Sequence, residues 1–221
     1  MTEPAVTLTD YALAIECAVF LFALARLDAR DRELCLWFVV FFASIGAASV
    51  FGGTVHGFFL AASSPGRRIL WPATLLSILV TSLAAWTIGA ILQLEERTAA
   101  LVRRLAIAQI VLFSLVVLFV KSKFYVAIIA YLPSTLFLLF ALLTTYRHRP
   151  DPAVRWGVTG LALTLAAAAV QQLHIGIHPV YFNHNALYHV IQGAALWMIF
   201  LAARSISRSW PPIRRSHDIK T

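Results

Sequence analysis

Seven stretches of the chain are almost continuously apolar, and each is long enough to cross a membrane. A hydrocarbon core about 30 Å thick needs roughly 20 residues of helix. Short segments rich in charge, proline or glycine separate these stretches, as in RLDARDREL and SSPGRR. We therefore expect transmembrane helices over approximately residues 8–27, 34–62, 69–92, 103–120, 123–146, 153–177 and 184–206.

The distribution of lysine and arginine predicts the orientation of these helices. Alternate connections divide the 18 basic residues unequally, and only four of them fall on the side of the N-terminus: Arg67, Arg68, Lys121 and Lys123. Basic residues concentrate in cytoplasmic loops, so we expect the N-terminus outside and the C-terminus in the cytoplasm. An odd number of spans agrees with that arrangement.

Composition supports an all-α integral membrane protein with a seven-helix bundle. The chain is 60% hydrophobic and only 13% charged, and it contains no repeat or low-complexity linker. We expect one transmembrane domain over residues 1–207 and a basic cytoplasmic tail over 208–221. The net charge of +8 then reflects topology, and no nucleic-acid partner is expected. Membrane lipids are the expected partners, and a bacterial-type inner (plasma) membrane is the expected location.

Three ionisable side chains are expected at one level near the outer face. Counting at 1.5 Å per residue puts His56 about 9 Å, His189 about 7 Å and Glu16 about 12 Å from the outer ends of their helices. Ionisable groups inside a membrane are costly and usually functional. Asn185, His189 and Gln192 follow one another at i, i+4 and i+7 and so form a polar stripe on the last helix.

Small residues precede His56 in the second span. Gly52 and Gly53 lie one turn before it and allow a ligand or a neighbouring helix to approach the backbone closely. Helix packing is the simpler interpretation of these glycines, and a substrate pocket lined by Gly52, Gly53 and Gln192 is the functional one.

The segments GTVHGF at 53–58 and NALYHVIQ at 185–192 resemble motifs of the CREST superfamily, which includes alkaline ceramidases and PAQR receptors. The resemblance implies a seven-helix fold in which three histidines hold a zinc ion that activates water to cleave a lipid amide or ester. Position by position, His56 and His189 match two of these histidines. Asn185 stands at the third histidine, and Gly52 stands where the superfamily has serine.

A zinc site on this pattern needs another third ligand, and His184, His178 and Glu16 are the candidates. We expect zinc on His56, His184 and His189, with Glu16 and Asn185 as catalytic residues and Glu16 accepting the proton of the bound water.

Three classes of function stay open at this point. The first is a zinc-dependent intramembrane hydrolase acting on a lipid amide or ester. The second is a non-catalytic seven-helix protein that binds a lipid or small ligand in the same polar pocket without metal. The third is a haem or electron-transfer subunit with His56 and His189 as axial ligands. A retinal protein is not expected, because no lysine lies in the interior of any span and Lys123 only begins one.

Overall fold

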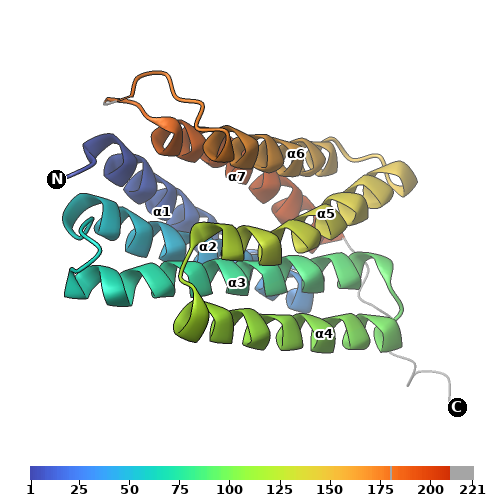
Figure 1. The fold of residues 1–221 in the computed structure, drawn as a ribbon. Coiled ribbons are helices and arrows are strands. Elements are labelled where there is room, and N and C mark those ends of the chain that lie inside the picture. The colour runs from blue at the N-terminus through green and yellow to red at the C-terminus, as the bar shows by residue number, and fades with distance from the viewer. Residues whose placement is uncertain (180, 210–221) are drawn as a thin grey trace, which may run out of the picture.

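The computed structural model describes residues 1–179 and 181–209, which form seven long helices (Figure 1). All seven are long and apolar enough to cross a membrane. Their bounds are α1 Pro4–Ala25, α2 Arg32–Phe58, α3 Pro65–Gln93, α4 Glu96–Leu115 with a π-helical extension η1 Val116–Val120, α5 Phe124–His148, α6 Pro152–Gln172 and α7 His184–Ser209. The expected helices are confirmed in number and order. The expected tail falls mostly on residues 210–221, which lie outside the described residues.

Local chemistry explains where several helices begin. The Asp31 carboxylate accepts a hydrogen bond from the Leu34 amide at 3.0 Å, and that of Asp151 accepts one from the Ala153 amide at 2.8 Å. Both are N-caps, which satisfy amides that the first turn of a helix leaves without a partner. The Asn183 side chain caps α7 by accepting from the amides of Asn185 and Ala186, each at 3.1 Å.

Two helices end earlier than the hydropathy pattern predicts. α2 stops at Phe58 instead of residue 62, and α6 stops at Gln172 instead of residue 177. After α6 the backbone of His174 has φ of 56°, a left-handed conformation that cannot continue an α-helix. Apolar residues therefore extend past both helix ends, and hydropathy alone does not locate the turn.

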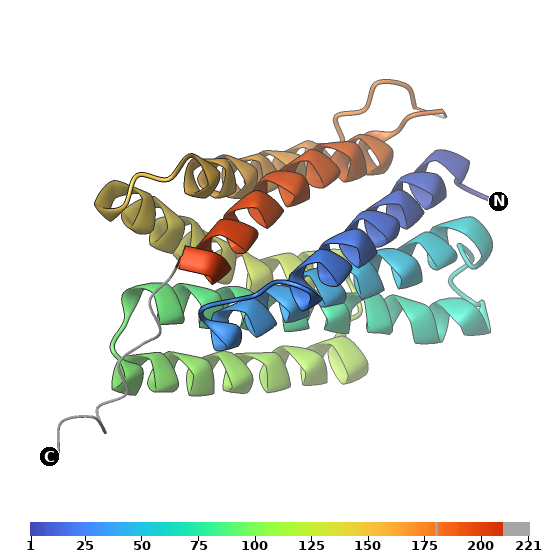
Figure 2. The same cartoon turned by 180° about the vertical axis from the view of Figure 1, so that it is seen from behind.

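Six helices form a closed ring, and α4 lies outside it. Each of α1, α2, α3, α5, α6 and α7 packs against its two neighbours in the order α1, α2, α3, α5, α6, α7, with α7 returning to α1. Figure 2 shows α1 and α7 side by side, and Figure 1 shows α4 along the edge of α3. The N-terminus and the end of α7 lie at opposite ends of the bundle.

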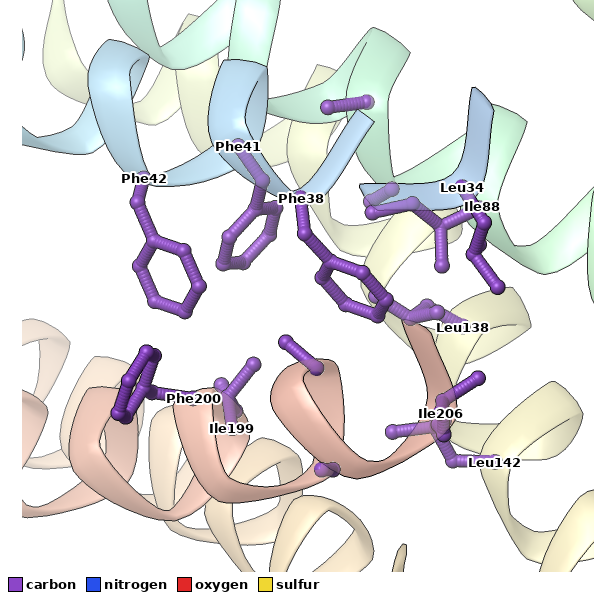
Figure 3. Packing of buried hydrophobic residues seen from close by; sticks show 14 of the residues in the cluster. Leu34, Phe38, Phe41, Phe42, Ile88, Leu138, Leu142, Ile199, Phe200 and Ile206 are labelled. Atoms are coloured by element: carbon purple, nitrogen blue, oxygen red, sulfur yellow. The ribbon is translucent and has the colours of Figure 1, made fainter. Parts of the chain in front are cut away.

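The half of the ring distant from the N-terminus is filled by a tightly packed core. Rings of Phe38, Phe41 and Phe42 on α2 face Ile199 and Phe200 on α7 (Figure 3). Phe20 of α1 stacks on Phe200 with centroids 4.4 Å apart and planes 7° apart. This packing holds the helices together at one end and leaves the interior at the other end for a cavity.

Candidate functional site

A cavity of about 220 Å³ lies inside the ring, in the half of the bundle that contains the N-terminus. All six ring helices contribute to its wall. Most of the lining surface is apolar, as is usual for ligand sites, although about half of the lining residues carry a polar group. The polar residues that matter most are Asp10, His56, Asn185, Tyr188, His189 and Gln192.

Asp10 and His189 form a buried pair at the junction of α1 and α7. His189 Nε2 lies 3.3 Å from Asp10 Oδ1, and both residues are less than a tenth exposed. On the other side of the ring, His189 Nδ1 lies 3.0 Å from the hydroxyl of Thr9. That hydroxyl also approaches the carbonyl oxygen of Ala5 at 2.8 Å.

The bonding of Thr9 indicates how His189 is protonated. A hydroxyl has one hydrogen to donate, and the Ala5 carbonyl is an acceptor that cannot supply one. With the Thr9 hydrogen directed to Ala5, its oxygen accepts from His189 Nδ1–H. Nε2 then faces the Asp10 carboxyl at 3.3 Å.

Asp10 is the acid in the wall of the inner cavity, and depth along the helices does not identify it, because depth takes no account of the face on which a residue lies. The buried residues of α1 include Val6, Asp10, Leu13 and Cys17, which recur at the spacing of one helix face. Glu16 lies six residues after Asp10, about 120° away around the axis. The heptad-like spacing of the apolar residues was the signal that could have identified Asp10.

Glu16 lines a different cavity, between α1 and α7. This second space of about 260 Å³ is also bordered by Thr9, His189 and Gly193. His189 therefore separates the two cavities and contributes to both walls. The expected convergence of Glu16 with His56 and His189 on one space is not what the structure shows, and Asp10 takes the place of Glu16 in the inner cavity.

His56 lines the inner cavity but lies closer to the helix end than expected. It is two residues before the end of α2, about 3 Å along the axis. Its Nδ1 is hydrogen-bonded to the carboxylate of Glu3, and the Glu3 amide donates to the His56 carbonyl at 3.3 Å. The segment before α1 is thus fastened to the end of α2, at the rim of the cavity.

His184 does not join the other two histidines of the expected zinc site. Its ring lies against that of His174 with centroids 4.5 Å apart, outside the lining of the inner cavity. Within residues 1–179 and 181–209, no three histidine, cysteine, aspartate or glutamate side chains form a group that could hold a metal ion. Both nitrogens of His189 already face protein groups, Thr9 and Asp10. The residues brought together here do not fit a three-ligand zinc centre.

The polar stripe on α7 does reach the cavity, as its spacing predicts. Asn185 Oδ1 accepts a hydrogen bond from Gln171 Nε2 at 3.4 Å, and Gln192 Nε2 donates to the Thr164 hydroxyl at 3.3 Å. Thr164 in turn donates its single hydroxyl hydrogen to the Gly160 carbonyl at 3.1 Å. Gln192 must therefore present its NH₂ group to Thr164, which leaves Gln192 Oε1 buried without a partner among the described residues.

The two glycines before His56 have different roles. A methyl group on Gly52 would lie 3.6 Å from Thr74 Cγ2 and 3.7 Å from Asp10 Oδ2, at the wall of the cavity. A methyl group on Gly53 would come within 2.8 Å of Asp10 Cβ. Gly52 lines the pocket as expected, whereas Gly53 is a close helix contact that lets α1 bring Asp10 inward.

Comparison with known proteins gives one family match. A family model described as a family of unknown function (DUF6962) matches residues 5–208, a span that includes all seven helices and both cavities. No curated protein and no solved structure matches the chain.

Proposed function

The chain belongs to the DUF6962 family, and from that premise we propose an integral membrane protein that binds a small ligand in the inner cavity of its seven-helix bundle. The N-terminus and the cavity rim face outward, and the C-terminus faces the cytoplasm. In this proposal the protein holds its ligand without a metal centre, which is the second of the function classes that the sequence left open.

The surface of the bundle supports insertion into a membrane. Large apolar side chains point outward along its length, including Ile15, Phe22 and Phe119, which are 67%, 58% and 79% exposed. In water such a surface would cause aggregation, whereas lipid tails cover it at no cost. The four basic residues expected outside all lie at the N-terminal end, next to the start of α3 or between η1 and α5.

The unpaired Oε1 of Gln192 is the observation that carries the ligand-binding proposal. Gln192 is only 6% exposed, and a buried polar atom without a partner costs about 1–3 kcal/mol. A ligand that donates a hydrogen bond to this oxygen would recover that energy. The cavity is large enough, because about 150 Å³ suffices for benzene in an engineered protein core.

Recovery of molecules that purify with the protein tests this function. We expect a small molecule in extracts of the wild type that is depleted about tenfold in Ser49→Leu, because Ser49 lines the inner cavity and leucine would fill part of it. Ser114→Leu on α4, outside the ring, is the matched control and should retain the molecule. Identical extracts from all three proteins, together with unchanged thermal stability on adding them back, would contradict the proposal.

The zinc-dependent lipid hydrolase stays a prediction that the same preparations test. Elemental analysis that finds stoichiometric zinc in the wild type and none in His56→Ala would favour it over a metal-free binding protein. A Soret band in the absorption spectrum would favour the haem hypothesis instead.

A further inference from the structure

Several side chains in the wall of the inner cavity have already committed their hydrogens and offer a ligand lone pairs. Thr74, Thr135 and Thr164 all line it, and each donates its hydroxyl hydrogen to the carbonyl four residues earlier in its own helix, at 2.9, 3.0 and 3.1 Å. What these hydroxyls can offer a ligand is their lone pairs.

Two further lining residues fit this pattern. The indole N–H of Trp71 is likewise engaged, by the Ser122 carbonyl at 2.9 Å. The unpaired oxygen of Gln192 adds an acceptor to the same wall.

The charged groups of the cavity wall favour a cationic ligand over an anionic one. Asp10 is the acid in the lining, and no lysine or arginine belongs to that lining in the part of the chain that the structure describes. The two imidazoles are already matched with acids, His56 with Glu3 and His189 with Asp10. Asp10 Oδ2 lies beside Gly52, which has no side chain to cover it. An anionic ligand would meet the Asp10 carboxyl with no lysine or arginine in the described lining to offset it, whereas a cation would meet a carboxyl whose neighbour, His189, can be a neutral imidazole.

Aromatic rings complete the wall. Trp71, Phe124, Tyr131 and Tyr188 all line the cavity. Ring faces attract cations, by about 0.5–1 kcal/mol at exposed sites and about 2 kcal/mol or more where water is excluded. Aromatic rings around one buried carboxyl suit an organic cation better than a metal ion, which would need several charged or imidazole ligands within bonding distance.

We propose that the ligand of the inner cavity is a small organic ammonium ion held by Asp10, the unpaired Gln192 Oε1 and the aromatic wall. This inference rests on the proposed ligand-binding function and names its substrate class. A bound ammonium group favours the ionised form of Asp10.

The test compares a cation with a neutral molecule of the same shape. The full chain is purified in lipid nanodiscs, and calorimetry measures binding of choline and of its uncharged isostere 3,3-dimethyl-1-butanol. Benzylammonium and benzyl alcohol form a second pair for the aromatic wall. We expect each cation to bind at least about tenfold more tightly than its neutral partner, because the positive charge is attracted to the Asp10 carboxylate and to the aromatic ring faces; benzylammonium, unlike choline, can also donate N–H hydrogen bonds.

Variants locate the charge that is responsible. Asp10→Asn should abolish the preference for the cation, and Gln192→Met should weaken it. Asp28→Asn removes the same charge from an exposed position between α1 and α2 and should change nothing. The comparison of each cation with its neutral partner uses only the wild-type protein. It therefore decides the proposal even if Asp10→Asn misfolds.

Two results would overturn the inference. If each neutral isostere binds as tightly as its cation and both are excluded by Ser49→Leu, the cavity binds ligands without selecting cations, and only the ammonium assignment fails. If neither cation binds at concentrations up to about 10 mM, where even weak complexes form, the assignment fails as well. The proposed ligand-binding function is then tested separately, by the extraction of molecules that purify with the wild type.

Discussion

Asp10 and His189 are buried together between α1 and α7, and each would be costly to bury alone. Their contact, with Thr9 on the far side of the imidazole, satisfies both ring nitrogens and places a carboxyl at the cavity wall. Buried polar groups of this kind persist where every member has a partner. Gln192, which also lines the cavity, has its Oε1 buried without a partner among the described residues, and the proposed ligand would supply one.

Substitution of the two adjacent glycines of α2 tests how closely Asp10 is held. Gly53→Ala forces a methyl group to 2.8 Å from Asp10 Cβ, so we expect it to lower the free energy of unfolding by about 1–3 kcal/mol. Gly52→Ala makes only ordinary contacts at 3.6 Å or more, and alanine favours a helix over glycine by up to about 1 kcal/mol.

Thermal unfolding in detergent, followed by circular dichroism, compares the two variants. The expected order of stability has Gly52→Ala at or above the wild type and Gly53→Ala clearly below it. Because the methyl group of Gly52→Ala projects beside Asp10 Oδ2, this variant should also bind the ammonium probes more weakly while remaining folded. Equal stability of the two variants would show that α1 is free to move away from α2.

At the scale of single helices, α7 supplies more polar lining residues than any other helix, and its start depends on a cap. Asn183 fixes the first turn, from which Asn185, His189 and Gln192 follow on one face. The segment between α6 and α7 folds back on itself through paired backbone bonds between His178 and Phe182, each 3.0 or 3.1 Å long. The polar stripe of α7 is therefore positioned by the segment that precedes the helix as well as by packing within the ring.

Removal of the α7 cap should destabilise the protein by a predictable amount. Asn183→Ala deletes the acceptor for the Asn185 and Ala186 amides, and we expect a loss of about 1 kcal/mol in the free energy of unfolding. Asn183→Asp keeps the acceptor at the positive end of the helix dipole and should restore stability. Unfolding by denaturant measures both variants, and equal losses in both would mean that the cap is not what fixes the start of α7.

The molecule as a whole is divided between a packed half and a hollow half. A cluster of phenylalanines joins α1, α2 and α7 at the end distant from the N-terminus, and the inner cavity occupies the opposite half. The cluster consists of Phe20, Phe38, Phe41, Phe42 and Phe200. Rigid packing at one end allows the helices to part slightly at the other without loss of the fold. In the proposed function, a ligand enters at the N-terminal end, where Glu3 and His56 lie at the rim.

Labelling of introduced cysteines tests the orientation of the bundle. Ser63→Cys lies exposed between α2 and α3, on the N-terminal side, and Asp28→Cys lies exposed between α1 and α2, on the other side. The natural Cys17 and Cys35 are free and buried, so they contribute little background. A membrane-impermeant maleimide added to intact cells should label Ser63→Cys at once and Asp28→Cys only after permeabilisation. The reverse pattern would place the cavity rim in the cytoplasm.

The sequence by itself determined the seven helices, their order and the polar stripe on the last of them. These features depend on local properties: a run of apolar residues long enough for a membrane, charged breaks, and a helical repeat that places Asn185, His189 and Gln192 on one face. Each can be computed along the chain without knowing which helix touches which.

Only the tertiary structure decided which side chains share the cavity. Depth along a helix is readable from sequence, but facing depends on how helices pack, and that choice brought Asp10 inward, left Glu16 between α1 and α7, and set His184 against His174. Helix packing is in turn set by contacts such as Gly53 against Asp10, between residues distant in the chain. On α1, Asp10 reaches the inner cavity and Glu16 does not, because the two residues lie about 120° apart around the helix axis.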